Sequence, residues 1–119
     1  MMLTLTADDQ TWLDAYRQVL REQFPGVVQD MIIFGSKARG TAGPDSDLDI
    51  VVIIREGDWR LKNTVTHPGY DLSIGTDVVP SLIVYTLAEW QRLRERQSVF
   101  REVVERDGVS VYETVSNPN

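Results

Sequence analysis

The sequence contains no cysteine and a single histidine, and both shortages exclude kinds of site. Without cysteine, the chain can form neither a disulfide nor a thiolate metal centre. One histidine, His67, rules out a multi-histidine metal cage within one chain. A metal ion bound by this chain therefore has to be held mainly by oxygen ligands.

Long hydrophobic runs and an excess of basic residues are also missing. The longest apolar runs, such as residues 50–54, are far shorter than the ~20 residues that cross a bilayer, and the first residues do not resemble a signal peptide. We therefore expect a cytoplasmic protein with no membrane partner. The net charge of −6 argues against broad nucleic-acid binding through a basic face. A compact anion such as ATP stays compatible, because Mg²⁺ and a few local cations can offset a triphosphate.

Length and hydrophobic periodicity predict one small domain of the mixed α/β (α+β) class. We expect the domain to span residues 1–119, with a short frayed tail at about 116–119. We expect two helices, each opened by a capping-box pattern, over about 6–24 and 86–107. We also expect four strands rich in β-branched residues, over 31–34, 47–54, 78–85 and 109–112. Residues 57–75 are ambiguous and read as a helix broken near Pro68. This order predicts a small mixed β-sheet flanked by helices.

The segment FGSKARGTAGPDSDLDIVV contains residue types that suit a phosphate site. Gly35 and Ser36 follow a predicted strand and precede a short helical turn. Glycine lets the backbone approach a ligand closely, and free amides at a helix start, helped by the Ser36 hydroxyl, suit phosphate oxygens. Taken alone, the pair is more typical of a simple strand-to-helix turn with Ser36 as its N-cap. Beside it, Lys37 and Arg39 could neutralise triphosphate charge, or be ordinary surface cations.

Asp47 and Asp49 lie two residues apart at the start of the next predicted strand. The alternation of a strand puts both carboxylates on one face and Leu48 on the other. Two such carboxylates repel each other unless a proton or a cation lies between them, and Mg²⁺ prefers oxygen ligands of this kind. A lone Asp-x-Asp is more often a pair of solvated acids. The Gly-Ser turn that precedes the two aspartates in the sequence favours a metal site beside a phosphate site over a pair of solvated acids.

The combined pattern resembles a known family. Gly-Ser, ten residues, and Asp-x-Asp form the signature of the polymerase-β-like nucleotidyltransferase superfamily, and the segment closely resembles the minimal nucleotidyltransferases. VVPSLIVYTLAEW and VFREVVERDGVSVYE look like the last part of these small proteins. The resemblance implies a polymerase-β-like fold and Mg²⁺-dependent transfer of a nucleoside monophosphate, foremost AMP from ATP, to a hydroxyl group.

The resemblance also implies roles for individual residues. Nucleotide binding falls to Gly35, Ser36, Lys37 and Arg39, and the catalytic metal ligands would be two aspartates, Asp47 and Asp49. A third carboxylate should come from the neighbouring strand, but residues 78–85 contain no acid, and Ser81 holds the plausible inward position. Asp77 shares the parity of Ser81 and would serve as a third ligand if that strand began early.

Partners follow from the same resemblance. Minimal nucleotidyltransferases often pair with small helical HEPN-domain proteins and act as antitoxins that transfer AMP to a tyrosine of the toxin. A homo-oligomer is the alternative source of an acceptor surface, because 119 residues leave little room for one. The missing third acid leaves a second interpretation open: a non-catalytic antitoxin that binds nucleotide or partner without turnover.

Overall fold

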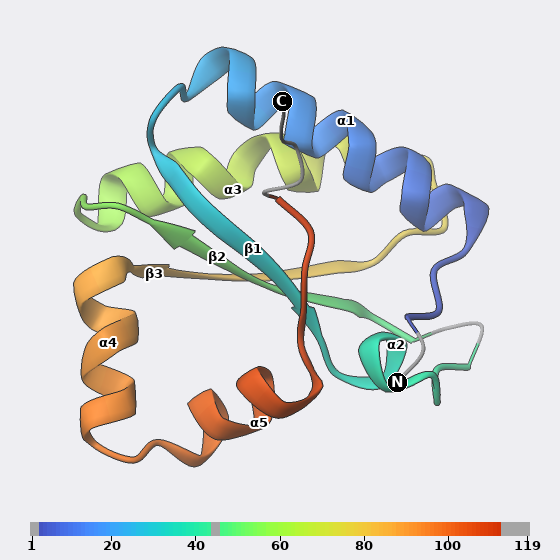
Figure 1. Ribbon diagram of the computed structural model, residues 1–119. Coiled ribbons are helices and arrows are strands. Elements are labelled where there is room, and N and C mark those ends of the chain that lie inside the picture. Colours follow the sequence, from blue (N-terminus) through green and yellow to red (C-terminus); the bar gives the residue numbers. More distant parts are fainter. Residues whose placement is uncertain (1–2, 44–45, 113–119) are drawn as a thin grey trace, which may run out of the picture.

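The computed structural model describes residues 3–43 and 46–112, which fold around one four-stranded sheet (Figure 1). The strand order is β3-β2-β1-β4, with β2 antiparallel to β1 and parallel to β3, and β4 antiparallel to β1. The elements in chain order are α1 Ala7–Gln23, β1 Val28–Phe34, α2 Ser36–Arg39, β2 Leu48–Ile54, α3 Trp59–Ser73, β3 Pro80–Thr86, α4 Leu87–Glu95, α5 Val99–Asp107 and β4 Val109–Ser110. The mixed sheet with flanking helices confirms the predicted fold class.

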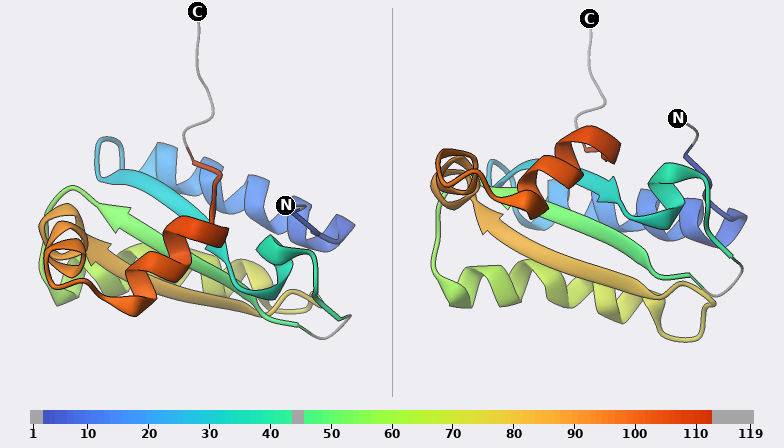
Figure 2. Two further views of the ribbon diagram at one scale, coloured as in Figure 1. Left: turned by 60° about the horizontal axis from the view of Figure 1, so that its bottom comes forward. Right: turned by 90° about the horizontal axis from the view of Figure 1, so that it is seen from below.

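Alternation along β2 divides the core into two layers, one on each face of the sheet. Even-numbered residues such as Ile50 and Val52 pack with α1 and α3, whereas Val51 and Ile53 pack with Trp90 of α4 and with α5. The two helix pairs lie on opposite sides of the sheet (Figure 2). β2 is buried along almost its whole length, and its odd-numbered side chains face α4 and α5.

Several element boundaries differ from the sequence-based expectation. The predicted helix 86–107 is two helices, because Gln97 has a left-handed φ of 57° and the Ser98 side chain caps α5 by accepting from the Arg101 amide. The first strand begins at Val28, earlier than expected, and β3 begins at Pro80, later than expected. The predicted tail at 116–119 lies outside the described residues.

The ambiguous segment 57–75 contains one unbroken helix, α3, although Pro68 lies inside it. Proline removes the amide that would bond to the Thr64 carbonyl, but Thr64 is exposed, so water can replace the donor. Two buried rings of α1 stabilise the helix from the other side: Tyr16 donates to the Val65 carbonyl (2.8 Å), and Trp12 donates to the Gly69 carbonyl (2.8 Å). Tertiary hydrogen bonds therefore outweigh the local signal of the proline.

We expect Tyr16→Phe to lower the free energy of unfolding by about 1 kcal/mol, because a buried carbonyl loses its donor while the ring packing stays. Urea denaturation of wild type and variant measures the difference. Equal midpoints would show that the hydrogen bond between α1 and α3 does not contribute to stability.

Candidate functional site

Gly35 lies directly against the carboxylate of Asp49. The antiparallel register pairs Phe34 with Asp49, so the turn that follows β1 passes beside the first residues of β2. A Cβ added to Gly35 would meet Asp49 Oδ2 at 2.3 Å, and Gly35 has a φ of 78° that residues with side chains rarely adopt. The backbone of the turn and the acid of the neighbouring strand therefore lie in direct contact.

Asp47 and Asp49 influence each other electrostatically. Asp47 is exposed just before β2, and Asp49 is half-buried within it. Burial raises the pKa of the Asp49 carboxyl, the neighbouring Asp47 charge raises it further, and Arg39 lowers it. A cation between the two carboxylates would relieve this repulsion. The donor set therefore fits a hard divalent ion such as Mg²⁺, with Asp47 and Asp49 as its protein ligands.

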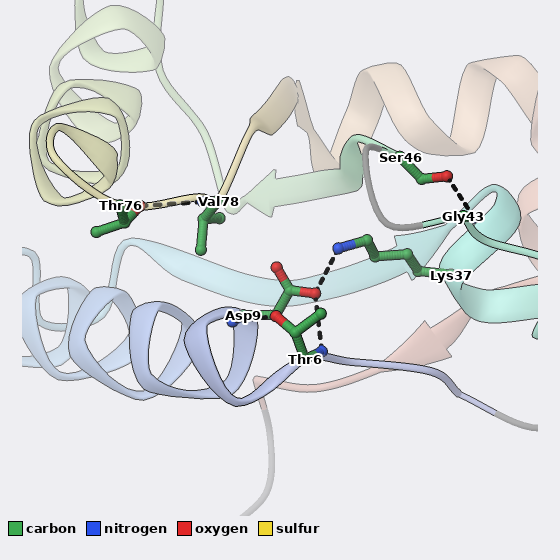
Figure 3. Close-up of polar contacts among 7 residues, drawn as sticks. All are labelled: Thr6, Asp9, Lys37, Gly43, Ser46, Thr76 and Val78. Atoms are coloured by element: carbon green, nitrogen blue, oxygen red, sulfur yellow. Dashed lines mark hydrogen bonds and ion pairs between the residues drawn. The ribbon is translucent and has the colours of Figure 1, made fainter.

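Ser36 is the first residue of α2, a helix of a single turn. Gly35 is its N-cap, so the alternative of Ser36 as the cap is wrong. The turn is closed by backbone hydrogen bonds from the Arg39 amide to the Gly35 carbonyl and from the Thr41 amide to the Ser36 carbonyl. Further along the loop, Ser46 Oγ accepts from the Gly43 amide at 2.9 Å (Figure 3).

Lys37 differs from the expectation of a phosphate ligand. Its ammonium group forms an ion pair with Asp9 of α1, and both residues are buried, at 5% and 1% exposure (Figure 3). Asp9 also belongs to the capping box of α1, where it accepts from the Thr6 amide. Sequence reasoning identified Asp9 only as a helix cap, because nothing in the local pattern indicates a contact with a residue 28 positions away.

Arg39 stays exposed on α2, within electrostatic range of two acids. Arg39 lowers the pKa of Asp49. The pKa of Asp107 is lowered first by its hydrogen bond with Arg106, and the charge of Arg39 makes the smallest contribution. The sequence-based assignment of Arg39 to the nucleotide is compatible with this position. Asp107, at the end of α5, was not expected near the site, since only the packing of α5 brings it there.

Among the residues that the structure describes, no third carboxylate joins the pair. The residue that pairs with Asp49 on β3 is Ser81, and β3 begins at Pro80 rather than early enough to include Asp77. Asp77 instead lines a pocket with residues of α1 and with Lys37. Across residues 3–43 and 46–112, no group of three acids or histidines is placed to hold a metal ion. The expectation of Asp77 as third ligand is therefore not met.

Comparison with known proteins identifies the class that this fold and site define. Residues 13–106 match the family model of the nucleotidyltransferase domain. The chain therefore belongs to the nucleotidyltransferase domain family, and this membership indicates nucleotidyl transfer as its activity. Among curated proteins, none gives a significant match. None of the described helices has the length and apolar character needed to span a membrane.

Three solved structures are similar in fold to this chain. Two mutant forms of the toxin–antitoxin complex MntA-HpeT match at 23% and 21% identity, with TM-scores of 0.56 and 0.54, covering 86% and 82% of this chain and 72% and 69% of theirs. A toxin–antitoxin with AMP-PNP matches at 22% identity and a TM-score of 0.55, covering 86% of this chain and 71% of that one. These similarities show that this chain shares its fold with a chain in each of these toxin–antitoxin structures.

We expect Gly35→Ala to lower the free energy of unfolding by about 1–3 kcal/mol through backbone strain, and also to abolish nucleotide binding, because the new methyl group displaces the Asp49 carboxylate. Gly26→Ala is the matched control: Gly26 has nearly the same φ, 77°, but nothing lies within 4 Å of its added Cβ. Urea denaturation and titration with a nucleoside triphosphate and Mg²⁺ measure both effects. A Gly35→Ala protein that binds as the control does would contradict this geometry.

The raised pKa of Asp49 predicts a pH-dependent effect of Asp49→Asn on stability. The folded protein disfavours the ionised form of the Asp49 carboxyl. Protonated Asp49 therefore favours folding at a pH below the ordinary carboxyl pKa, and this stabilisation is lost as the pH rises through the raised pKa of the folded state. In metal-free buffer, Asp49→Asn should therefore raise the Tm at pH 7 and leave it unchanged at pH 3. Calorimetry at the two pH values measures this. A lower Tm at pH 7 would count against the electrostatic description.

Proposed function

We propose that this chain transfers AMP from ATP to a hydroxyl group of a partner protein, in the cytoplasm, as the antitoxin of a toxin–antitoxin pair. The observation that carries the proposal is the contact between the Gly35 turn and the Asp49 carboxylate. A triphosphate at the turn would lie within reach of a cation held by Asp47 and Asp49. Membership of the family supports the reaction class, and this contact supports the Gly35 turn as the place of the reaction.

In the proposed reaction, the acceptor oxygen attacks the α-phosphorus, the bond to the β-phosphate breaks, and pyrophosphate leaves. Mg²⁺, when bound by Asp47 and Asp49, supplies charge stabilisation at the attacking and leaving oxygens. Gly35 and Ser36 hold the β- and γ-phosphates, and the exposed Arg39 neutralises phosphate charge. No third carboxylate accompanies the pair among the described residues, so the hydroxyl proton passes to solvent.

The fold neighbours support the identity of the partner. Their structures are those of toxin–antitoxin complexes, and one contains AMP-PNP, an analogue of ATP. We propose that the acceptor is a tyrosine of a small helical HEPN-domain toxin. A second copy of this chain is the alternative acceptor, since the described residues form one small sheet with its flanking helices and leave little surface for an additional substrate domain.

One observation favours a second candidate function. Ser81 occupies the strand position opposite Asp49, where an acid would complete the metal site. With two carboxylates, the metal would be held more weakly and the acceptor hydroxyl activated less. In this alternative, the chain is a non-catalytic module that binds nucleotide or toxin and neutralises the toxin by covering it.

We expect Asp47→Asn/Asp49→Asn to lose transfer of labelled AMP by at least 10²-fold, because the cation loses both of its protein ligands. The measurement uses α-labelled ATP, Mg²⁺ and the candidate toxin, with intact-mass analysis of the toxin after incubation. Omission of Mg²⁺ should reproduce the loss in the wild-type protein. The variant's circular dichroism spectrum serves as the control for folding.

The two candidate functions give different results in this assay. Catalysis predicts a toxin heavier by one AMP with the wild-type protein and unmodified with the double variant. If the double variant labels the toxin as well as wild type does, the site assignment is wrong. If the toxin stays unmodified with both proteins and both still neutralise it, the non-catalytic function is the correct one.

A further inference from the structure

The ion pair between Lys37 and Asp9 joins the site to a distant helix. Lys37 is the second residue of α2, directly after the Gly35–Ser36 turn, and Asp9 lies in the first turn of α1. In Figure 3, the Lys37 side chain extends from α2 toward α1, where Asp9 Oδ2 accepts from both the Lys37 ammonium and the Thr6 amide. The charge on Lys37 is therefore neutralised by a carboxylate of the protein itself.

The backbone of the same residue is held from the same segment. The Thr4 amide donates to the Lys37 carbonyl at 2.8 Å, and the next residue, Ala38, is completely buried. A helix of four residues has no stability of its own, because nucleation of a helical turn is unfavourable. Tertiary contacts therefore decide where α2 lies, and residues 4–9 supply two of them.

We propose that Lys37 and Asp9 are positioning residues for nucleotide binding. The inference rests on the proposed function, in which Gly35 and Ser36 hold the β- and γ-phosphates. The pair fixes α2 against α1 and thereby sets the direction of the turn's amides relative to Asp49. Without the ion pair, the turn samples other orientations. The population that can bind the phosphates through the turn's amides and the cation at the same time then falls, and the affinity for nucleotide falls with it.

A purely structural role makes a different prediction. A buried ion pair that only contributes to stability changes the amount of folded protein, and the folded fraction then binds nucleotide as wild type does. The positioning role changes the affinity of the folded protein itself. The two roles are separable at a temperature well below the Tm.

The test uses Asp9→Asn/Lys37→Met in the full chain. Asparagine keeps an oxygen for the Thr6 amide, and methionine keeps the apolar stem, so neither charge is left unpaired in the interior. Asp58→Asn/Arg60→Met is the matched control: it neutralises an exposed ion pair whose acid caps α3, at the opposite end of β2 from the site. Tyr16→Phe adds a control for lost stability away from the turn.

Two measurements are made on each protein: the Kd of AMP-PNP with Mg²⁺, and hydrogen exchange of the Arg39 and Thr41 amides without ligand. We expect Asp9→Asn/Lys37→Met to raise both the Kd and the exchange rates about tenfold, and both controls to leave them unchanged. An unchanged Kd overturns the proposal, whether or not the exchange rates rise.

If the wild-type protein does not bind AMP-PNP with Mg²⁺, the proposed function fails. The hydrogen-exchange measurement then still decides whether the pair orders the turn: rates equal to those of wild type overturn that part of the inference as well.

Discussion

The pairing of Phe34 with Asp49 is the constraint on which the site depends. It brings the end of β1 beside the start of β2, so that Gly35 passes against the Asp49 carboxylate. A slip of one residue would turn Asp49 into the core below α1 and α3, where an unpaired charge is costly. Both faces of β2 beyond Asp49 are apolar and buried, so the cost of burying the Asp49 charge is what opposes this slip. The pairing of β1 with β2 therefore fixes the position of a polar site.

The charges around the turn are divided between two tasks. The repulsion between Asp47 and Asp49 adds to burial, which is the larger cause, in raising the pKa of Asp49. Lys37, which has the charge to relieve it, is committed to Asp9. In our proposals, a divalent cation neutralises the local negative charge of the two acids and binds the triphosphate, while the ion pair of Lys37 and Asp9 holds the turn in place.

Much of this arrangement was predictable from local patterns, and the rest depended on tertiary contacts. The capping box at Thr6 and the β-branched run of β2 predicted the fold class. The spacing from Gly35 to Asp49 drew attention to two residues that the register of β1 and β2 brings into contact. The unbroken α3 could not be predicted, because hydrogen bonds from α1 outweigh Pro68. The partner of Lys37 was missed for the same reason, since a contact with α1 leaves no mark in the adjacent sequence. The start of β3, and with it the place of Asp77, depends on pairing with β2.

If β1 and β2 together form the nucleotide site, a bound cation must lie between the Gly35 turn and the two aspartates. A crystal structure of the protein with Mn²⁺ and AMP-PNP, read from the anomalous scattering of manganese, measures its position. We expect a manganese ion ligated by Asp47 and Asp49, with the β- and γ-phosphates against Gly35 and Ser36. Manganese bound elsewhere, or a triphosphate on the α1 and α3 side of the sheet, would contradict it.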